Sequence, residues 1–271
     1  MYTYTWKERA KELNSRLASI LVKKGVETSV DETTTSLINK VNDISVGESG
    51  IDLTAVITGE AIDLVIPDGI TYVRSYAFYG HAGITSAHIP DSVTGMGQRV
   101  FHNCKNLSAV RVSKIENLSS YAFCGCSKLT EIELPEETLY ISSNAFQDCT
   151  SLERIVYSSL LKLLGTSAFQ GCSALKEITI PASITTLGSN VFKGCAALEY
   201  IYLGNGFNRT GLDLSDTDLP SEETIQNMGI AYADGTGLEA LTLTISLKVY
   251  ERLSDETKAI FTNKNITLVV V

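Results

Sequence analysis

The chain has 271 residues, enough for one large domain or an array of repeats, and it is too long to depend on disulfides for its stability. Hydrophobic residues make up 44% of it and charged residues 20%, which excludes extensive disorder. With 22 Lys and Arg against 31 Asp and Glu the net charge is −9, so nucleic acid and anionic membrane surfaces are not expected partners. No apolar run approaches the roughly 18 residues of a membrane span, so membrane insertion is not expected either.

The first 46 residues are predicted to form two helices. The start of the chain, residues 1–9, lacks the basic head and apolar core of a signal peptide, so we expect no export signal in it. An apolar stripe at helical spacing predicts a helix over residues 6–24. A second helix is predicted from Ser29, where Glu32 completes a capping-box spacing. We expect residues 1–46 either to cap the array that follows or to form a separate hairpin for docking or oligomerisation.

A repeat of 22 to 23 residues fills residues 61–205. Phe recurs in each unit, and a Cys follows it three residues later, except that the first unit has His81. A short alternating strand closes each unit, as in Glu131 to Leu134, where Ile132 points inward. One unit cannot bury its apolar edge alone, so neighbours are expected to stack about 4.8 Å apart with parallel strands. The six Phe positions are Phe78, Phe101, Phe123, Phe146, Phe169 and Phe192.

One unit shows the full pattern, and it resembles the BspA-like leucine-rich repeat, also called the Treponema pallidum type. The residues that carry the resemblance are Ile180-Pro181-Ala182-Ser183-Ile184, Leu187, Val191-Phe192, Gly194-Cys195 and Leu198. We therefore expect an α/β repeat fold: a right-handed leucine-rich-repeat solenoid with a parallel concave sheet, an N-terminal helical cap and a C-terminal α/β cap. The resemblance also implies a bacterial, often surface-displayed, binding or adhesion module without catalytic residues.

Residues 206–271 are predicted to form an α/β capping module. Its expected elements are a strand at 212–214, a helix after Ser221, a strand over 241–249, a helix over 254–262 and a strand over 265–271. We expect these strands to extend the sheet of the repeats. Segments at both ends, Val22 to Val26 with Leu37 to Val41 and Leu241 to Leu268, resemble parts of phage tail-associated and structural proteins. A structural or receptor-binding component of a phage or prophage tail is therefore the alternative function.

The six cysteines predict buried thiols rather than disulfides or a metal site. Stacked Cys side chains point inward in parallel, which the dihedral angle of a disulfide does not allow. Cys124 lies outside the ladder and is expected to be the exposed thiol. No second cysteine pair stands at zinc-ligand spacing, so no metal or cofactor is expected. Of the histidines, His81 is expected to be packed and His102 solvated.

No motif of the sequence predicts catalysis. It contains no nucleophile elbow, phosphate-binding loop or His-Glu-x-x-His. Glu131 and Glu133 form a carboxylate pair, but an open sheet offers nothing that would raise the pKa of an acid partner. We therefore expect solvated carboxylates, no catalytic residues and no enzyme.

The outward columns of the concave sheet are the expected ligand surface. Cross-strand charge ladders are predicted where Arg111 stands beside Glu131 and Glu133 and where Arg154 stands beside Glu177. Exposed aromatic residues are enriched in binding sites, and the last repeat strand carries two of them, although the terminal module could instead pack over both. The expected ligand is a protein or carbohydrate surface, and the expected location is the cell surface or, alternatively, a phage particle. The candidate site is Tyr200, Tyr202, Glu177, Thr179, Arg154, His88 and Arg111.

Overall fold

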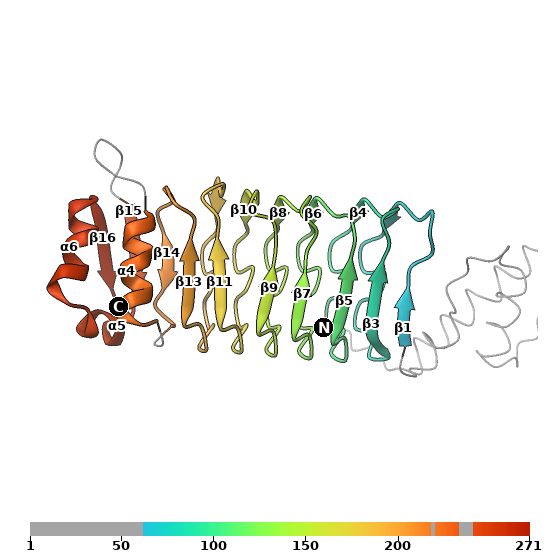
Figure 1. Cartoon of the computed structure of the whole chain (residues 1–271). Coiled ribbons are helices and arrows are strands. Elements are labelled where there is room, and N and C mark those ends of the chain that lie inside the picture. The colour runs from blue at the N-terminus through green and yellow to red at the C-terminus, as the bar shows by residue number, and fades with distance from the viewer. Residues whose placement is uncertain (1–61, 218–219, 233–240) are drawn as a thin grey trace, which may run out of the picture.

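The protein is a solenoid of parallel strands (Figure 1). The computed structural model describes residues 62–217, 220–232 and 241–271, so the two helices expected within residues 1–46 lie outside the described residues. One face, which we call the long-strand face, carries one strand before the first repeat and one further strand at the end of each of the six repeats. Its strands are β1 (Ile62–Val65), β3 (Ile84–Ile89), β5 (Ala109–Val112), β7 (Glu131–Glu133), β9 (Arg154–Val156), β11 (Glu177–Ile180) and β13 (Tyr200–Leu203).

The repeat period fixes the register of these strands, and the expected columns are confirmed. Val65, His88, Arg111, Glu133 and Val156 stand opposite one another along five strands. The side chains between them, such as Ala87 and Ile132, point into the core because successive residues of a strand alternate faces. The sheet is not continuous, however: β1, β3, β5, β7 and β9 form one sheet, and β11 pairs only with β13.

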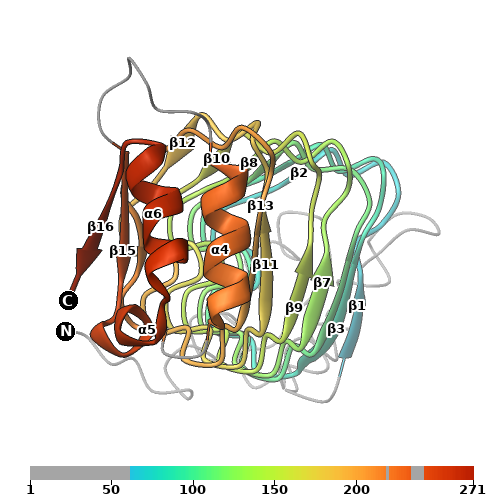
Figure 2. The ribbon, with the colours of Figure 1, turned by 60° about the vertical axis from the view of Figure 1, so that its left-hand side comes forward.

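A second, shorter ladder runs along the opposite side of the solenoid (Figure 2). It was not expected from the sequence. Each of its strands is two residues long, and a residue with a left-handed backbone, at φ between 56° and 63°, follows three positions later. The strands are β2 (Tyr72–Val73), β4 (Gly95–Met96), β6 (Asn117–Leu118), β8 (Tyr140–Ile141), β10 (Leu163–Leu164) and β12 (Thr186–Leu187).

The core between the two ladders is a stack of identical side chains. The Phe rings follow one another at centroid distances of 5.2 to 6.0 Å, in nearly parallel planes. Each ladder Cys donates its Sγ hydrogen to the carbonyl of the Phe one repeat earlier, at 3.0 or 3.1 Å. The six thiols are free and buried, so the expected burial of the ladder thiols is confirmed.

Two expectations about the outer turns are wrong. Cys124 is only 6% exposed, although it lies outside the ladder. His102, expected in solvent, is half-buried and stacks on the ring of Tyr79 at 4.9 Å. Both residues follow a core Phe directly, so each lies between its equivalents in the two neighbouring repeats. Burial, and the charge of nearby Arg99, lower the pKa of His102. His81 is half-buried, so it is less enclosed than the packed ring we expected.

Residues 206–271 form an α/β module in which helices take the place of long strands. Helix α4 packs against β13, and α6 packs against α4 in turn (Figure 2). The module does not extend the long-strand sheet as expected, because its strands form a separate sheet in the order β14-β15-β16. The strand predicted over 241–249 ends at Ile245, where Ser246 caps a short helix. The elements are β14 (Leu212–Leu214), α4 (Glu222–Ala231), β15 (Leu241–Ile245), α5 (Leu247–Arg252), α6 (Asp255–Asn263) and β16 (Ile266–Val270).

Candidate ligand-binding face

A hollow of about 510 Å³ lies on the long-strand face where the sheet is interrupted. One wall comes from β9 and the turn after it, the other from β11 and its turn, and Tyr202 closes one end. The hollow brings four candidate residues together: Arg154, Glu177, Thr179 and Tyr202.

Tyr157 accounts for the interruption of the sheet. In other repeats the amide at this position donates to the carbonyl of the next strand, as Ile66 does to His88 at 3.1 Å and Leu134 to Val156 at 2.8 Å. Next to β9, the phenol hydroxyl of Tyr157 donates instead to the Thr179 carbonyl, at 2.5 Å. Burial raises the pKa of this phenol well above its ordinary value. The ring thus spans the seam between β9 and β11.

Arg154 and Glu177 form the charged pair that the columns predicted. Nε of Arg154 lies 3.6 Å from Oε1 of Glu177, and both side chains are exposed. An exposed pair of this kind contributes at most about 1 kcal/mol and is screened by salt. Both groups can therefore exchange their mutual contact for contacts with a ligand at little cost.

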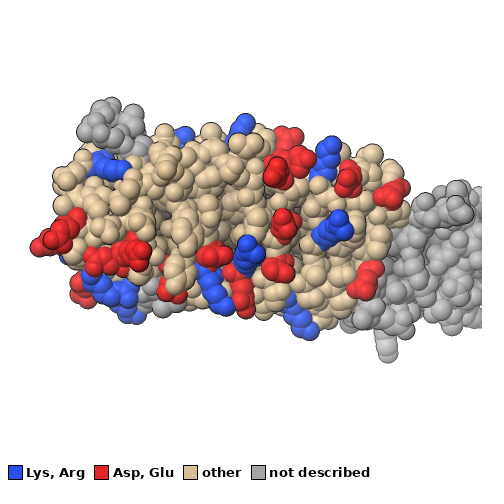
Figure 3. Space-filling view, viewed as in Figure 1, with Lys and Arg blue, Asp and Glu red and all other residues tan. Residues whose placement is uncertain are grey.

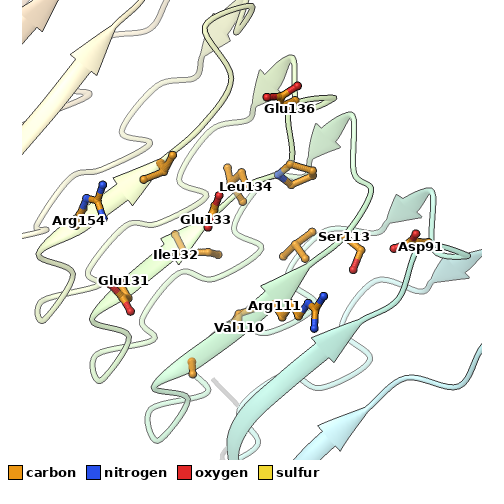
Figure 4. A pocket seen from close by; sticks show the side chains of 14 residues that line it. Asp91, Val110, Arg111, Ser113, Glu131, Ile132, Glu133, Leu134, Glu136 and Arg154 are labelled. Atoms are coloured by element: carbon orange, nitrogen blue, oxygen red, sulfur yellow. The ribbon is translucent and has the colours of Figure 1, made fainter.

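The second expected charge ladder is wrong. Arg111 stands opposite Glu133 in the register, yet no ion pair joins them within the described part of the chain. Figure 4 shows the Arg111 side chain directed away from Glu133. Both residues line a second, wider hollow of about 860 Å³ over β5, β7 and β9, which Arg154 borders as well. Arg111 thus belongs to a neighbouring part of the same face.

The two tyrosines of β13 remain accessible. Tyr200 is 44% exposed and Tyr202 is 53% exposed, so the alternative that the terminal module packs over them is wrong. Tyr202 lines the hollow beside β11, while Tyr200 stands opposite Glu177 at the start of the strand pair. A hydrogen bond with Glu199 and the negative charge of that residue raise the pKa of Tyr200.

The last candidate, His88, is not at the hollow. It lies half-buried on β3, opposite Val65 and Arg111. The structure therefore gathers four of the seven candidates at one hollow, places Tyr200 beside it and leaves Arg111 and His88 further along the face.

Sequence reasoning missed the polar groups on the floor of the hollow. Ser158 and Ser183 line it, and Ser183 donates to the carbonyls of Ser159 and Leu161 at 2.8 and 2.7 Å. One signal could have located them: Tyr157 stands where the neighbouring repeats have Leu134 and Ile180. An aromatic hydroxyl at an inward aliphatic position needs a hydrogen-bond partner, which disturbs the ladder beside it.

The face as a whole carries interspersed charges of both signs rather than one uniform field (Figure 3). Within residues 62–217, 220–232 and 241–271, no group of three or more His, Cys, Asp or Glu side chains could hold a metal ion. No helix in the described residues combines the length and apolarity that crossing a bilayer requires.

Comparisons with known proteins agree with this architecture. The family model for the BspA type leucine-rich repeat region matches residues 58–175 and 112–214. A search of curated protein sequences found no match.

Among solved structures, a leucine-rich repeat protein from Eubacterium ventriosum is 24% identical, with a TM-score of 0.41; the match covers 49% of this chain and 42% of that one. The Treponema pallidum leucine-rich repeat protein is 22% identical, with a TM-score of 0.40 and coverage of 78% and 87%. A leucine-rich cell surface protein from Faecalibacterium prausnitzii is 19% identical, with a TM-score of 0.48 and coverage of 77% and 78%.

The family match stops at residue 214, and the expected resemblance of the two ends to phage proteins is not shown. That match spans more than half of the chain, and the chain belongs to the BspA-type leucine-rich repeat family.

Proposed function

We propose that the protein is a non-catalytic binding module of a bacterial surface, and that it holds a protein or glycan on the long-strand face. The observation that carries this proposal is the hollow at the β9–β11 seam, where an exposed Tyr202 faces Arg154, Glu177 and Thr179. The bacterial surface is proposed because of the family to which the repeats belong.

The chemistry of the hollow favours a ligand with both polar and apolar surface. Tyr202 and Val156 offer exposed apolar area. Arg154 and Glu177 offer one charge of each sign, and Thr179 adds a hydroxyl. A loop of a protein partner or a saccharide ring with its hydroxyls presents such a mixture. A strongly charged polymer of one sign would gain little here, because the two charges oppose each other.

The rigidity of the repeats supports binding on this face. The side chains of the columns stand on strands whose register is fixed by the neighbouring repeats. A preorganised surface loses little conformational entropy when a ligand is bound, so more of the contact energy appears as affinity. Aromatic rings supply the largest contact area for each side chain that is ordered.

The test begins with a glycan array and a displayed peptide library, both probed with the full chain. For each probe recovered, dissociation constants are then compared between the unmodified protein and the double variant Tyr200→Ala/Tyr202→Ala. Loss of these rings should weaken binding by more than 1 kcal/mol, since aromatic anchors dominate such interfaces.

Tyr72→Ala is the matched control. Tyr72 is 55% exposed, close to the 53% of Tyr202, but it lies on the short-strand ladder. The control should bind as the unmodified protein does, with the same thermal midpoint in all variants. Equal binding by the double variant, or equal weakening by the control, would remove the long-strand face as the site.

A further inference from the structure

Among the described residues, no element covers the outer edge of the C-terminal sheet. β16 is the last strand in the order β14-β15-β16, and Figure 2 shows no other described element beyond it. The exposed large apolar residues at this edge are Val269, Val270 and Val271.

The backbone of β16 offers hydrogen-bonding groups on its open side. The amide of Val271 donates to Ile245, and its carbonyl accepts from Leu247, so Val271 faces the inner neighbour β15. Residues alternate sides along a strand in a parallel pair, so Thr267 and Val269 also face β15. The amides and carbonyls of Ile266, Leu268 and Val270 therefore point away from the sheet.

β16 lacks the devices with which proteins usually protect a strand edge. Such devices are charges, bulges, very short strands or a covering helix. At the other end of the solenoid, β1 carries Asp63 and has an irregular register at Ile62. The edge of β13 is covered by α4. Residues 266–271 contain no charged side chain, no proline and no glycine, and β16 presents five consecutive residues of strand.

We propose that β16 pairs with β16 of a second copy of this chain, in an antiparallel arrangement with its two-fold axis at Leu268. The outward residues then match: Leu268 faces Leu268 of the other copy, and Ile266 faces Val270. Thr267 of one copy stands opposite Val269 of the other. The strand is its own complement, because no like charges meet and every outward backbone group finds a partner. The two three-stranded sheets become one.

This dimer is independent of the proposed ligand site. The long-strand face and β16 belong to different layers of the fold, so each copy keeps its hollow free. An edge pair of this length is small compared with the roughly 1,600 Å² of a standard interface, and we expect a weak dimer. Sedimentation velocity of the full chain should show a mass rising with concentration from 29.4 kDa towards twice that value.

A charge-swap pair tests the register. In Thr267→Lys/Val269→Lys, two pairs of introduced lysines would face each other across the two-fold axis, and the protein should be monomeric at every concentration. In Thr267→Lys/Val269→Glu, each introduced lysine would face an introduced glutamate, and the dimer should return. Both side chains lie on the exposed face of β16, and circular dichroism checks that the variants fold.

Val270→Pro provides a second test. The Val270 amide faces away from β15, so proline removes two hydrogen bonds of the dimer, one from each copy, and none of the monomer. The variant should fold and dissociate at least tenfold more readily. The proposal is overturned if the unmodified chain stays monomeric even at the highest concentration that sedimentation velocity can measure. It is also overturned if the two-lysine variant still dimerises, or if the lysine–glutamate variant does not.

Discussion

Replacing a phenylalanine in the middle of the stack tests whether the repeats stabilise one another. Phe146 is fully buried, and its ring lies 5.6 Å from Phe123 and 5.5 Å from Phe169. Truncation to Ala removes the buried ring, leaves a cavity and breaks two stacked pairs, so Phe146→Ala should cost about 3–5 kcal/mol of unfolding free energy. Of that total, the two ring pairs account for roughly 1–3 kcal/mol.

The ends of the stack provide the comparison. Phe192 is buried but stacks only on Phe169, at 6.0 Å, so its loss should fall at the lower end of that range. Phe78 is half-buried, and within the described residues its ring stacks on Phe101 alone, so Phe78→Ala should cost about 2 kcal/mol or less. Urea unfolding followed by circular dichroism gives the three values, with equal m-values as the check on the transition. Equal losses at all three positions would refute the stacked-core reasoning.

Two further predictions concern titratable groups. No cysteine of the folded protein should react with a thiol reagent at pH 8. The reason is that burial raises the pKa of Cys104 to about 12 and that of Cys124 to about 11. Rapid labelling of Cys124 before unfolding would contradict its burial. Hydrogen bonds from Ser254 and Thr257 lower the pKa of Glu222 from 4.5 to about 2. The ionised carboxylate therefore stabilises the fold above pH 4.5, and this stabilisation is lost as the pH falls towards 2. The thermal midpoint of Glu222→Gln should therefore lie further below that of the unmodified protein at pH 7 than at pH 2.5, and an equal gap would count against this role.

The repeat period made most of the fold predictable. A constant spacing places equivalent residues above one another, so the Phe ladder, the Cys ladder and the outward columns follow directly from the sequence. The same spacing also stacks the outer turns of successive repeats on one another. Cys124 and His102 are each enclosed by their equivalents in adjacent repeats, although neither belongs to an apolar landmark position.

The period of the repeat could not predict structural features that arise where a single residue differs from the repeat pattern. The interruption between β9 and β11 depends on the reach of a single phenol hydroxyl, that of Tyr157. The left-handed backbone after each short strand does recur with the period, but it was not predictable either, because bulky residues such as Tyr76, Arg99 and Tyr121 rarely adopt it. In the C-terminal module, the alternation of apolar and polar residues continues past Ile245 in the sequence, but the strand ends there because Ser246 caps the helix that follows.

We propose that ligand is held in the hollow at the β9–β11 seam, and a bulky label that blocks this hollow provides the sharpest test. Because the six native thiols are buried, a single introduced cysteine can be labelled selectively. Thr179→Cys places a bulky maleimide in the hollow, while Glu116→Cys places it at an exposed position that does not line the hollow. For a probe recovered from the glycan array or peptide library, the label at position 179 should weaken binding at least tenfold, about 1.4 kcal/mol, and the label at position 116 should leave it unchanged. Unchanged binding with position 179 labelled would contradict the claim.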